Sequence, residues 1–187
     1  MQHKMKKLIT TIYILGCLTY SFTSHAQTVP NEVIQGPFKT DLYPDGKIYF
    51  EKENDATNND PCQTIAFILE YKQDNHIKKE QIDEYSEDGA CVELASVFFA
   101  KVHNKSYIFV MQKWGHNMPS VDISNDFYTT TAYTKDQDGS LIIDSKMFND
   151  PNLSGTDGYV DDGVRHRRYY KYKTAAAIKK YLKQKYQ

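Results

Sequence analysis

The chain has 187 residues, of which 23 are Lys or Arg, 24 are Asp or Glu and three are Cys. A hydrophobic share of 40% is too high for a disordered chain, and a charged share of 25% is too high for an integral membrane protein. Fifteen tyrosines against nine glycines and six prolines exclude a low-complexity sequence. The length fits one ordinary domain, with or without a processed leader.

The first 26 residues have the pattern of a secretory signal peptide. Three lysines and no acid precede an apolar run from Leu8 to Leu18, and the small residues Ser24 and Ala26 form a cleavage site. The run is shorter than the roughly 20 residues that span a bilayer, which disfavours an uncleaved anchor helix. We therefore expect a signal peptide at 1–26, a single domain at 27–187, and a periplasmic or secreted protein.

Cys17 supports a second interpretation of the leader. Ile14-Leu15-Gly16-Cys17 looks like a bacterial lipobox, in which the cysteine takes a lipid and becomes the new N-terminus. Apolar residues continue past Cys17, so we favour cleavage after Ala26. Contact with a membrane is expected only if Cys17 is lipidated, which would give a lipid-anchored envelope protein.

Two cysteines remain after the leader, and we expect them to form a disulfide. Cys62 and Cys91 are an even pair in a chain predicted to be exported, where oxidising conditions favour bridging. Two free buried thiols are the alternative. A metal site is disfavoured because neither cysteine has a second ligand at short spacing.

Hydrophobic periodicity predicts a mainly β fold built of successive antiparallel hairpins. Residues 64–72 alternate between apolar and polar, as a half-buried strand does. Residues 91–102 are apolar on both faces and would fit a strand or a helix. We favour a strand, because Val and Phe dominate and hairpin spacing separates the segment from the next run. The expected strands are 38–43, 47–52, 64–72, 77–85, 91–102, 107–114, 127–134, 141–148 and 165–173.

The rest of the chain is expected to form turns, loops and one C-terminal helix. Polar loops are predicted at 53–61, 115–126 and 149–163. Thr174 is a candidate N-cap for a helix at 174–186 with an apolar stripe and lysines toward its C-terminus. A helix of this length is marginal alone, so it should dock on the sheet. The predicted fold is an antiparallel α+β sandwich or curved roll.

Charge is distributed unevenly along the chain. Residues 165–187 hold nine basic side chains and no acid. Such a segment is typical of a surface for an anionic partner, unless it pairs internally with an acidic strand such as 77–84. Export and the net acidity of the chain without its leader weigh against a nucleic-acid partner. The candidate binding residues are Arg165, Arg167, Arg168, Lys171, Lys173 and, as an interface anchor, Trp114.

Segment 149–163 gathers four carboxylates among turn residues. Calcium takes several oxygen ligands from a flexible loop, so the segment is a candidate cation site. Its spacing does not match an EF-hand, however, and Asp and Gly are also what turns require. We expect no cofactor, and the metal-ligand candidates are Asp150, Asp157, Asp161 and Asp162.

His116 and Asp122 are the best local acid–base pair for catalysis. Catalysis needs a nucleophile or paired acid and base groups. The sequence contains no G-x-S-x-G, H-E-x-x-H or phosphate-loop motif. A cysteine nucleophile is disfavoured if Cys62 and Cys91 are bridged. The sequence therefore leans away from an enzyme.

A small exported β-rich domain with one disulfide and no catalytic motif fits a binding role best. We expect it to bind another envelope protein, and more specifically to be an inhibitor or immunity-type protein, because segregated charge speeds and orients encounter. Two alternatives remain open: a secreted hydrolase that uses His116 and Asp122, and a small-ligand or lipid carrier with a cavity inside its sheet. The sequence identifies neither the partner nor the oligomeric state.

Overall fold

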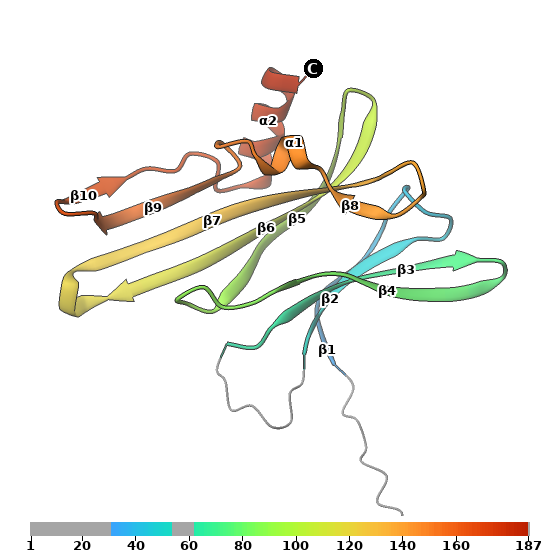
Figure 1. Cartoon of the computed structure of the whole chain (residues 1–187), viewed down its shortest axis with the longest axis horizontal. Coiled ribbons are helices and arrows are strands. Elements are labelled where there is room, and N and C mark those ends of the chain that lie inside the picture. Colours follow the sequence, from blue (N-terminus) through green and yellow to red (C-terminus); the bar gives the residue numbers. More distant parts are fainter. Residues whose placement is uncertain (1–30, 54–61, 187) are drawn as a thin grey trace, which may run out of the picture.

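The computed structural model describes residues 31–53 and 62–186 (Figure 1). The predicted signal peptide with Cys17 and most of the predicted 53–61 loop lie outside the described residues. Within them the chain is mainly β, with two antiparallel sheets and a C-terminal helix that packs on one of them. The predicted fold class is therefore confirmed.

The smaller sheet is a four-stranded meander. Its order is β1-β2-β3-β4, with the charged strand β4 at one edge. Most β4 side chains are exposed, and charges on an edge strand discourage further pairing. The strands are β1 (Glu32–Lys39), β2 (Lys47–Lys52), β3 (Ile65–Gln73) and β4 (His76–Tyr85).

The larger sheet has six strands and carries the surface described below. Its order is β10-β9-β7-β6-β5, with β8 paired to β7. The segment that fits a strand or a helix is a strand, β5. The strands are β5 (Val92–Val102), β6 (Lys105–Met118), β7 (Ile123–Lys135), β8 (Leu141–Ile143), β9 (Ser154–Asp161) and β10 (Arg165–Arg168).

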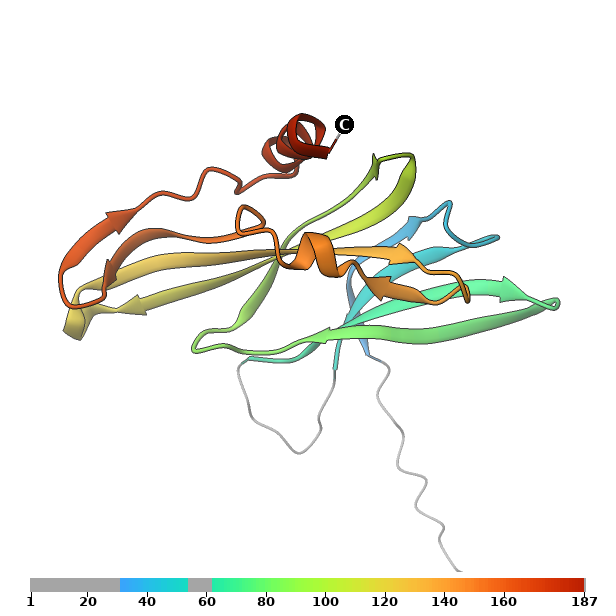
Figure 2. The same cartoon turned by 45° about the horizontal axis from the view of Figure 1, so that its top comes forward.

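Two hydrophobic layers lie on opposite faces of the larger sheet. Between the sheets, Phe50 and Phe67 stack at 4.9 Å between ring centroids and pack with Ile108 and Val110, all fully buried. Burying one such side chain contributes about 1.5–3 kcal/mol. Figure 2 shows the larger sheet lying between the smaller sheet and α2 (Ala175–Tyr186). Phe50, Phe67, Ile108 and Val110 thus fill the middle of the space between the sheets.

The C-terminal helix forms where the sequence predicts it. The backbone N–H of Ala177 donates to Thr174 Oγ1 at 3.2 Å, so Thr174 is the N-cap. Ile178 and Leu182 are buried against Phe98 of the sheet. The apolar stripe of α2 is thus fully used in docking, while Lys179, Lys180 and Lys183 are exposed.

The predicted disulfide is present. Cys62 and Cys91 are bonded, with their Cα atoms 4.6 Å apart. One precedes β3 of the smaller sheet and the other precedes β5 of the larger sheet, so the bond joins the two sheets. A disulfide is typical of an oxidising compartment outside the cytoplasm. No helix in the part of the chain that the structure describes is long and apolar enough to cross a membrane.

The prediction of a loop at 115–126 is wrong. β6 and β7 continue through it as a ladder from Gly115↔Asp126 to Met118↔Ile123, closed by a single 3-10 turn, η1 (Pro119–Val121). These residues lack an apolar face because this end of the hairpin is not covered by the smaller sheet (Figure 1). A strand exposed to solvent on both sides gives no alternating pattern.

Four further boundaries differ from the prediction. The strand predicted at 38–43 is instead β1, and a turn follows it in which the Gly46 N–H donates to the Tyr43 carbonyl at 3.0 Å. The predicted 141–148 strand ends early because Asp144 caps a short helix, α1 (Ser145–Phe148), by accepting from the Met147 N–H at 3.0 Å. The predicted 149–163 loop contains β9, and the basic strand predicted at 165–173 is only the four residues of β10.

Candidate interaction surface

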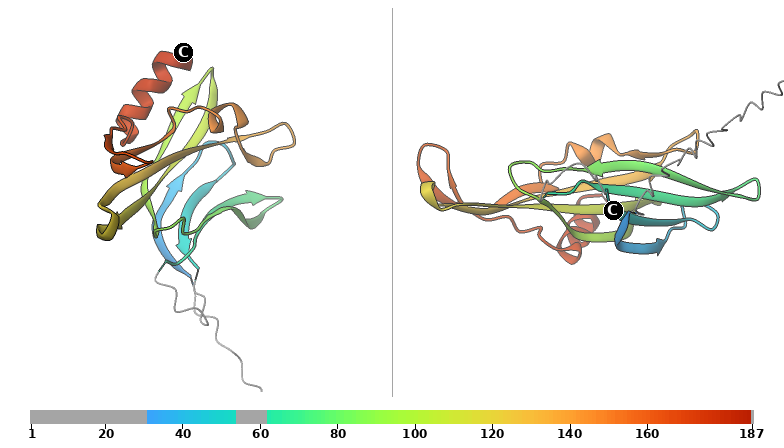
Figure 3. Two further views of the ribbon diagram at one scale, coloured as in Figure 1. Left: turned by 60° about the vertical axis from the view of Figure 1, so that its left-hand side comes forward. Right: turned by 90° about the horizontal axis from the view of Figure 1, so that it is seen from below.

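The ends of four strands of the larger sheet form a projecting arm. We use "arm" for residues 115–126 of the β6–β7 hairpin and 158–168 of the β9–β10 hairpin. Figure 1 and both views of Figure 3 show the arm extending beyond the smaller sheet. The two hairpins pair through Ser124↔Tyr159 and Asn125↔Gly158. Gly158 has φ 130°, and a Cβ there would lie 2.5 Å from the Ser124 carbonyl oxygen, so only glycine permits this approach.

Two arginines of β10 contact the rings of Tyr159 in β9 and Tyr169 just after β10. The Arg165 guanidinium lies 4.3 Å from the Tyr159 ring centroid, and the Arg167 guanidinium lies 5.7 Å from Tyr159 and 4.8 Å from Tyr169. Cation–π contacts at exposed sites contribute about 0.5–1 kcal/mol each, so they favour these positions of the arginine side chains. We call these contacts the arginine–tyrosine ladder. They restrict the conformations that the arginine side chains adopt before a partner binds.

The tip of the arm is apolar. Val121 in η1 is 52% exposed, and Val164, in the β9–β10 turn, is 74% exposed. The Arg165 side chain joins the two turns by an ion pair of 3.2 Å with Asp122, next to Val121. Among the described residues, eleven large hydrophobic side chains are exposed, and five of these lie on the arm or directly after it. We call these five the tip patch: Met118, Val121, Tyr159, Val164 and Tyr169.

The acidic 149–163 segment neutralises part of the basic tail. Lys173 Nζ lies 2.7 Å from an Asp157 oxygen, and an Arg168 nitrogen lies 2.7 Å from an Asp162 oxygen. Part of the basic segment therefore pairs internally with acidic residues. The strand beside it is β9 and not the 77–84 strand. Acidic and basic residues close in sequence meet because β9 and β10 form a hairpin.

The four metal-ligand candidates do not converge on one point. Asp157 and Asp162 face the cations named above, Asp161 accepts from the Gly163 N–H at 3.0 Å, and Asp150 binds Lys185. Among residues 31–53 and 62–186, no group of three or more His, Cys, Asp or Glu side chains could hold a metal ion. The geometry of these carboxylates is that of ion pairs and turns.

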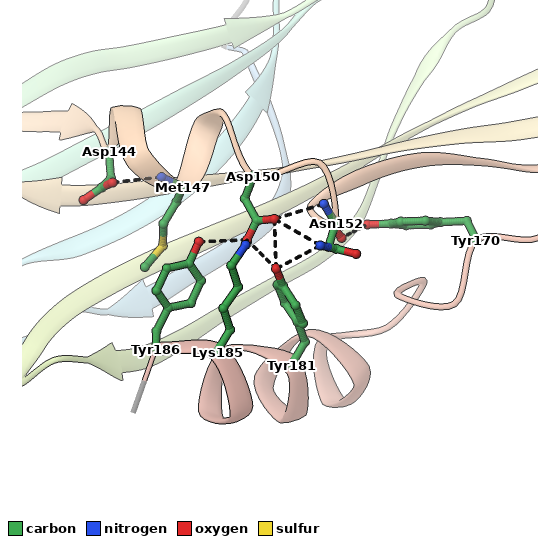
Figure 4. Close-up of polar contacts among 8 residues, drawn as sticks. All are labelled: Asp144, Met147, Asp150, Asn152, Tyr170, Tyr181, Lys185 and Tyr186. Carbon is green, nitrogen blue, oxygen red and sulfur yellow. Dashed lines mark hydrogen bonds and ion pairs between the residues drawn. The ribbon is translucent and has the colours of Figure 1, made fainter.

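Asp150 is the centre of a buried polar cluster that fastens α2 to the sheet (Figure 4). Its side chain is 1% exposed and accepts hydrogen bonds from Tyr181 at 2.6 Å and Tyr186 at 2.8 Å. The Lys185 ammonium lies 3.0 Å away, and the Asn152 N–H donates at 3.1 Å. Every group around the carboxylate is a donor, so the cluster stabilises the ionised form.

These hydrogen-bond donors determine whether the pKa of Asp150 is raised or lowered from its ordinary value. Burial by itself would raise the pKa of Asp150, but the hydrogen bonds from Tyr181, the Asn152 backbone, Lys185 and Tyr186 outweigh it. The pKa of Asp150 is therefore lowered well below its ordinary value.

The pH dependence of stability follows from this shift. A lowered carboxyl pKa contributes stability that is fully present above the unfolded pKa of about 3.9 and is lost as the pH falls toward the folded value. We expect the free energy of unfolding to decrease as the pH drops below about 4, and to decrease less steeply in an Asp150→Asn variant. Urea unfolding at pH values from about 7 to 2 measures both slopes. If the free energy of unfolding decreased equally steeply with falling pH in both proteins, the assignment of this pH dependence to Asp150 would be wrong.

The structure gives His116 and Asp122 separate partners. His116 Nε2 lies 3.0 Å from the Asp88 carbonyl oxygen, whereas the Asp122 carboxylate pairs with Arg165. Trp114 is half-buried against the core between the sheets, and its indole N–H donates to the Ser86 carbonyl at 3.1 Å. Trp114 and His116 thus tether the turn before β5 to β6, and neither belongs to the tip patch.

Sequence reasoning found the arginines of this surface but missed its apolar members. Met118 and Val121 stand in a segment that it assigned to a loop, and Val164 falls between a predicted loop and a predicted strand. A usable signal exists in retrospect, since Val121 and Val164 are isolated apolar residues among turn-forming ones. A single exposed apolar side chain is normal on a protein surface, but several of them on adjacent turns suggest contact with another surface.

The fold and surface define the class: a disulfide-linked, two-sheet antiparallel β protein with a helix on one face and a projecting arm that carries arginines and exposed apolar side chains. Comparisons with protein-family models, with curated proteins and with solved structures give no significant match to this chain.

Proposed function

We propose that this chain is an exported envelope protein that binds another protein through the tip of its arm. The observation that carries the proposal is the tip patch, where exposed apolar and aromatic side chains of two adjacent hairpins are flanked by arginines. Aromatic residues, Met and Arg are the types enriched at protein interfaces. The Cys62–Cys91 disulfide supports an oxidising compartment for this interaction.

Pre-organisation adds to the support. The Arg165–Asp122 ion pair and the arginine–tyrosine ladder hold the tip in one arrangement, so binding immobilises few additional side chains. Arg167 makes ring contacts but no carboxylate contact among the described residues, which leaves its charge to orient an acidic partner. An inhibitor or immunity-type protein needs such a rigid, projecting surface to enter the cleft of a target enzyme or toxin.

A double variant of the tip patch tests the proposal. The purified protein is immobilised and exposed to envelope extract at low salt, and we expect one stoichiometric partner. Val121→Asp with Val164→Asp should abolish its capture, because two charges in a desolvated contact cost well over 2 kcal/mol, or about 30-fold in Kd. Thermal unfolding should be unchanged, since both side chains are exposed.

Ile77→Asp is the matched control. Ile77 is 76% exposed, about as much as Val164, but it lies on the β3–β4 hairpin, at the opposite end of the molecule from the arm (Figure 1). We expect this variant to capture the partner as the unsubstituted protein does. Absence of any stoichiometric partner, or equal capture by the Val121/Val164 variant, would count against the proposal.

A further inference from the structure

A hollow with a basic lining lies between α2 and the segment that precedes it. Its volume is about 280 Å³, and four of its lining residues fall at positions i, i+3, i+4 and i+7 of α2, which is one face of a helix. The other two come from residues 171–172. The full lining is Lys171, Tyr172, Ala177, Lys180, Tyr181 and Gln184. We call this site the lysine hollow.

The walls of the lysine hollow are held in place. The Tyr172 and Tyr181 rings pack with their centroids 4.8 Å apart, and the Tyr181 hydroxyl is fixed by Asp150 (Figure 4). The Lys171 ammonium lies 4.7 Å from the Tyr172 ring centroid. The buried cluster around Asp150 therefore fixes one wall, and a ring contact positions one of the two cations.

The positive charge of the lysine hollow is not neutralised within the described chain. Its lining contains no carboxylate, and Lys171 and Lys180 make no ion pair among residues 31–53 and 62–186. The nearest acids in sequence are already used, since Asp157 binds Lys173 and Asp150 binds Lys185. Lys183, three residues after Lys180 on a helix without acids, adds like charge. An anion from outside would relieve this repulsion.

We propose that the lysine hollow binds a phosphate group. Phosphate offers several acceptor oxygens and negative charge, which suits a lining with two lysines and a glutamine. The phosphate belongs either to a soluble phosphate ester or to a phospholipid headgroup, since both present the same chemistry. The site is on α2 and is independent of the tip patch, so it goes beyond the proposed function.

Two titrations on the full chain distinguish these sources. Inorganic phosphate is added at fixed ionic strength while amide resonances are followed by NMR, and we expect saturable shifts at Lys171, Ala177 and Gln184. Co-sedimentation with phosphatidylcholine vesicles, with and without phosphatidylglycerol, tests the lipid source. Lys171→Gln with Lys180→Gln should weaken whichever binding is seen by at least about tenfold.

Lys72→Gln with Lys78→Gln is the control, because it removes the same charge from exposed lysines of the β3–β4 hairpin. It should bind as the unsubstituted protein does. Saturable phosphate shifts support the proposal with a soluble source, and binding only to anionic vesicles supports it with a lipid source. Binding in neither titration, or equal weakening by the control, overturns it. The Val121/Val164 variant should bind normally here, so failure of this proposal and of the proposed function are distinguishable.

Discussion

Replacing Asp150 by Asn is expected to lower the free energy of unfolding by about 2–4 kcal/mol. The change keeps the size of the side chain but turns one acceptor oxygen into a donor. The groups around that oxygen, from Tyr181, Tyr186 and Lys185, are themselves donors. At least one of them is left without an acceptor at a site that is 1% exposed, and a buried unsatisfied group carries its full desolvation cost.

The loss should be largest at α2, because three of the donors belong to that helix. Urea unfolding measures the global change, and limited trypsin digestion reports whether the lysines of α2 become accessible. Asp162→Asn is the matched control, since Asp162 is an exposed carboxylate paired with Arg168 at 2.7 Å. Its effect should stay within about 0.5 kcal/mol. If both variants unfold at the same urea concentration, the central role of Asp150 is wrong.

Reduction of the Cys62–Cys91 bond is expected to lower the free energy of unfolding by about 3–4 kcal/mol. The two residues are 29 positions apart, and a bond that closes a loop of that length removes this much conformational freedom from the unfolded chain. The loop contains the whole β3–β4 hairpin, so the bond also limits how far the two sheets separate on unfolding.

Denaturant unfolding with and without reductant measures this effect, with thiol alkylation and mass spectrometry to establish the redox state. A Cys62→Ser, Cys91→Ser protein should match the reduced protein and be insensitive to reductant. If reductant left the unfolding midpoint unchanged while both thiols became alkylated, the bond would contribute nothing to stability.

Local patterns were sufficient for one strand and for the C-terminal helix. The period-two alternation of 64–72 became β3, and the capped apolar stripe of 174–186 became α2 docked on the sheet. In both, the hydrophobic effect acts on apolar residues whose spacing along the chain matches the period of the element. The disulfide was equally predictable, because only two cysteines follow the predicted leader.

The arm could not be predicted in the same way. Its strands at 115–118, 123–126 and 158–161 are held by ladder hydrogen bonds to each other, with little apolar surface to reveal them. Backbone hydrogen bonds form for nearly any side chain, so they leave no sequence pattern. The tip patch was missed for this reason, although the arginines beside it were among the expected binding residues.

The sequence by itself determined that this chain is β-rich, ends in a helix, joins two cysteines and concentrates cations in its last 23 residues. Only the tertiary structure decided which of those cations are neutralised. Lys173 and Lys185 meet Asp157 and Asp150 across the fold, whereas Arg167, Lys171 and Lys180 make no such contact among the described residues. The physical reason is that hydrophobic periodicity depends only on residues close together in the sequence. The partner of a charged side chain depends instead on which strands and helices pack side by side.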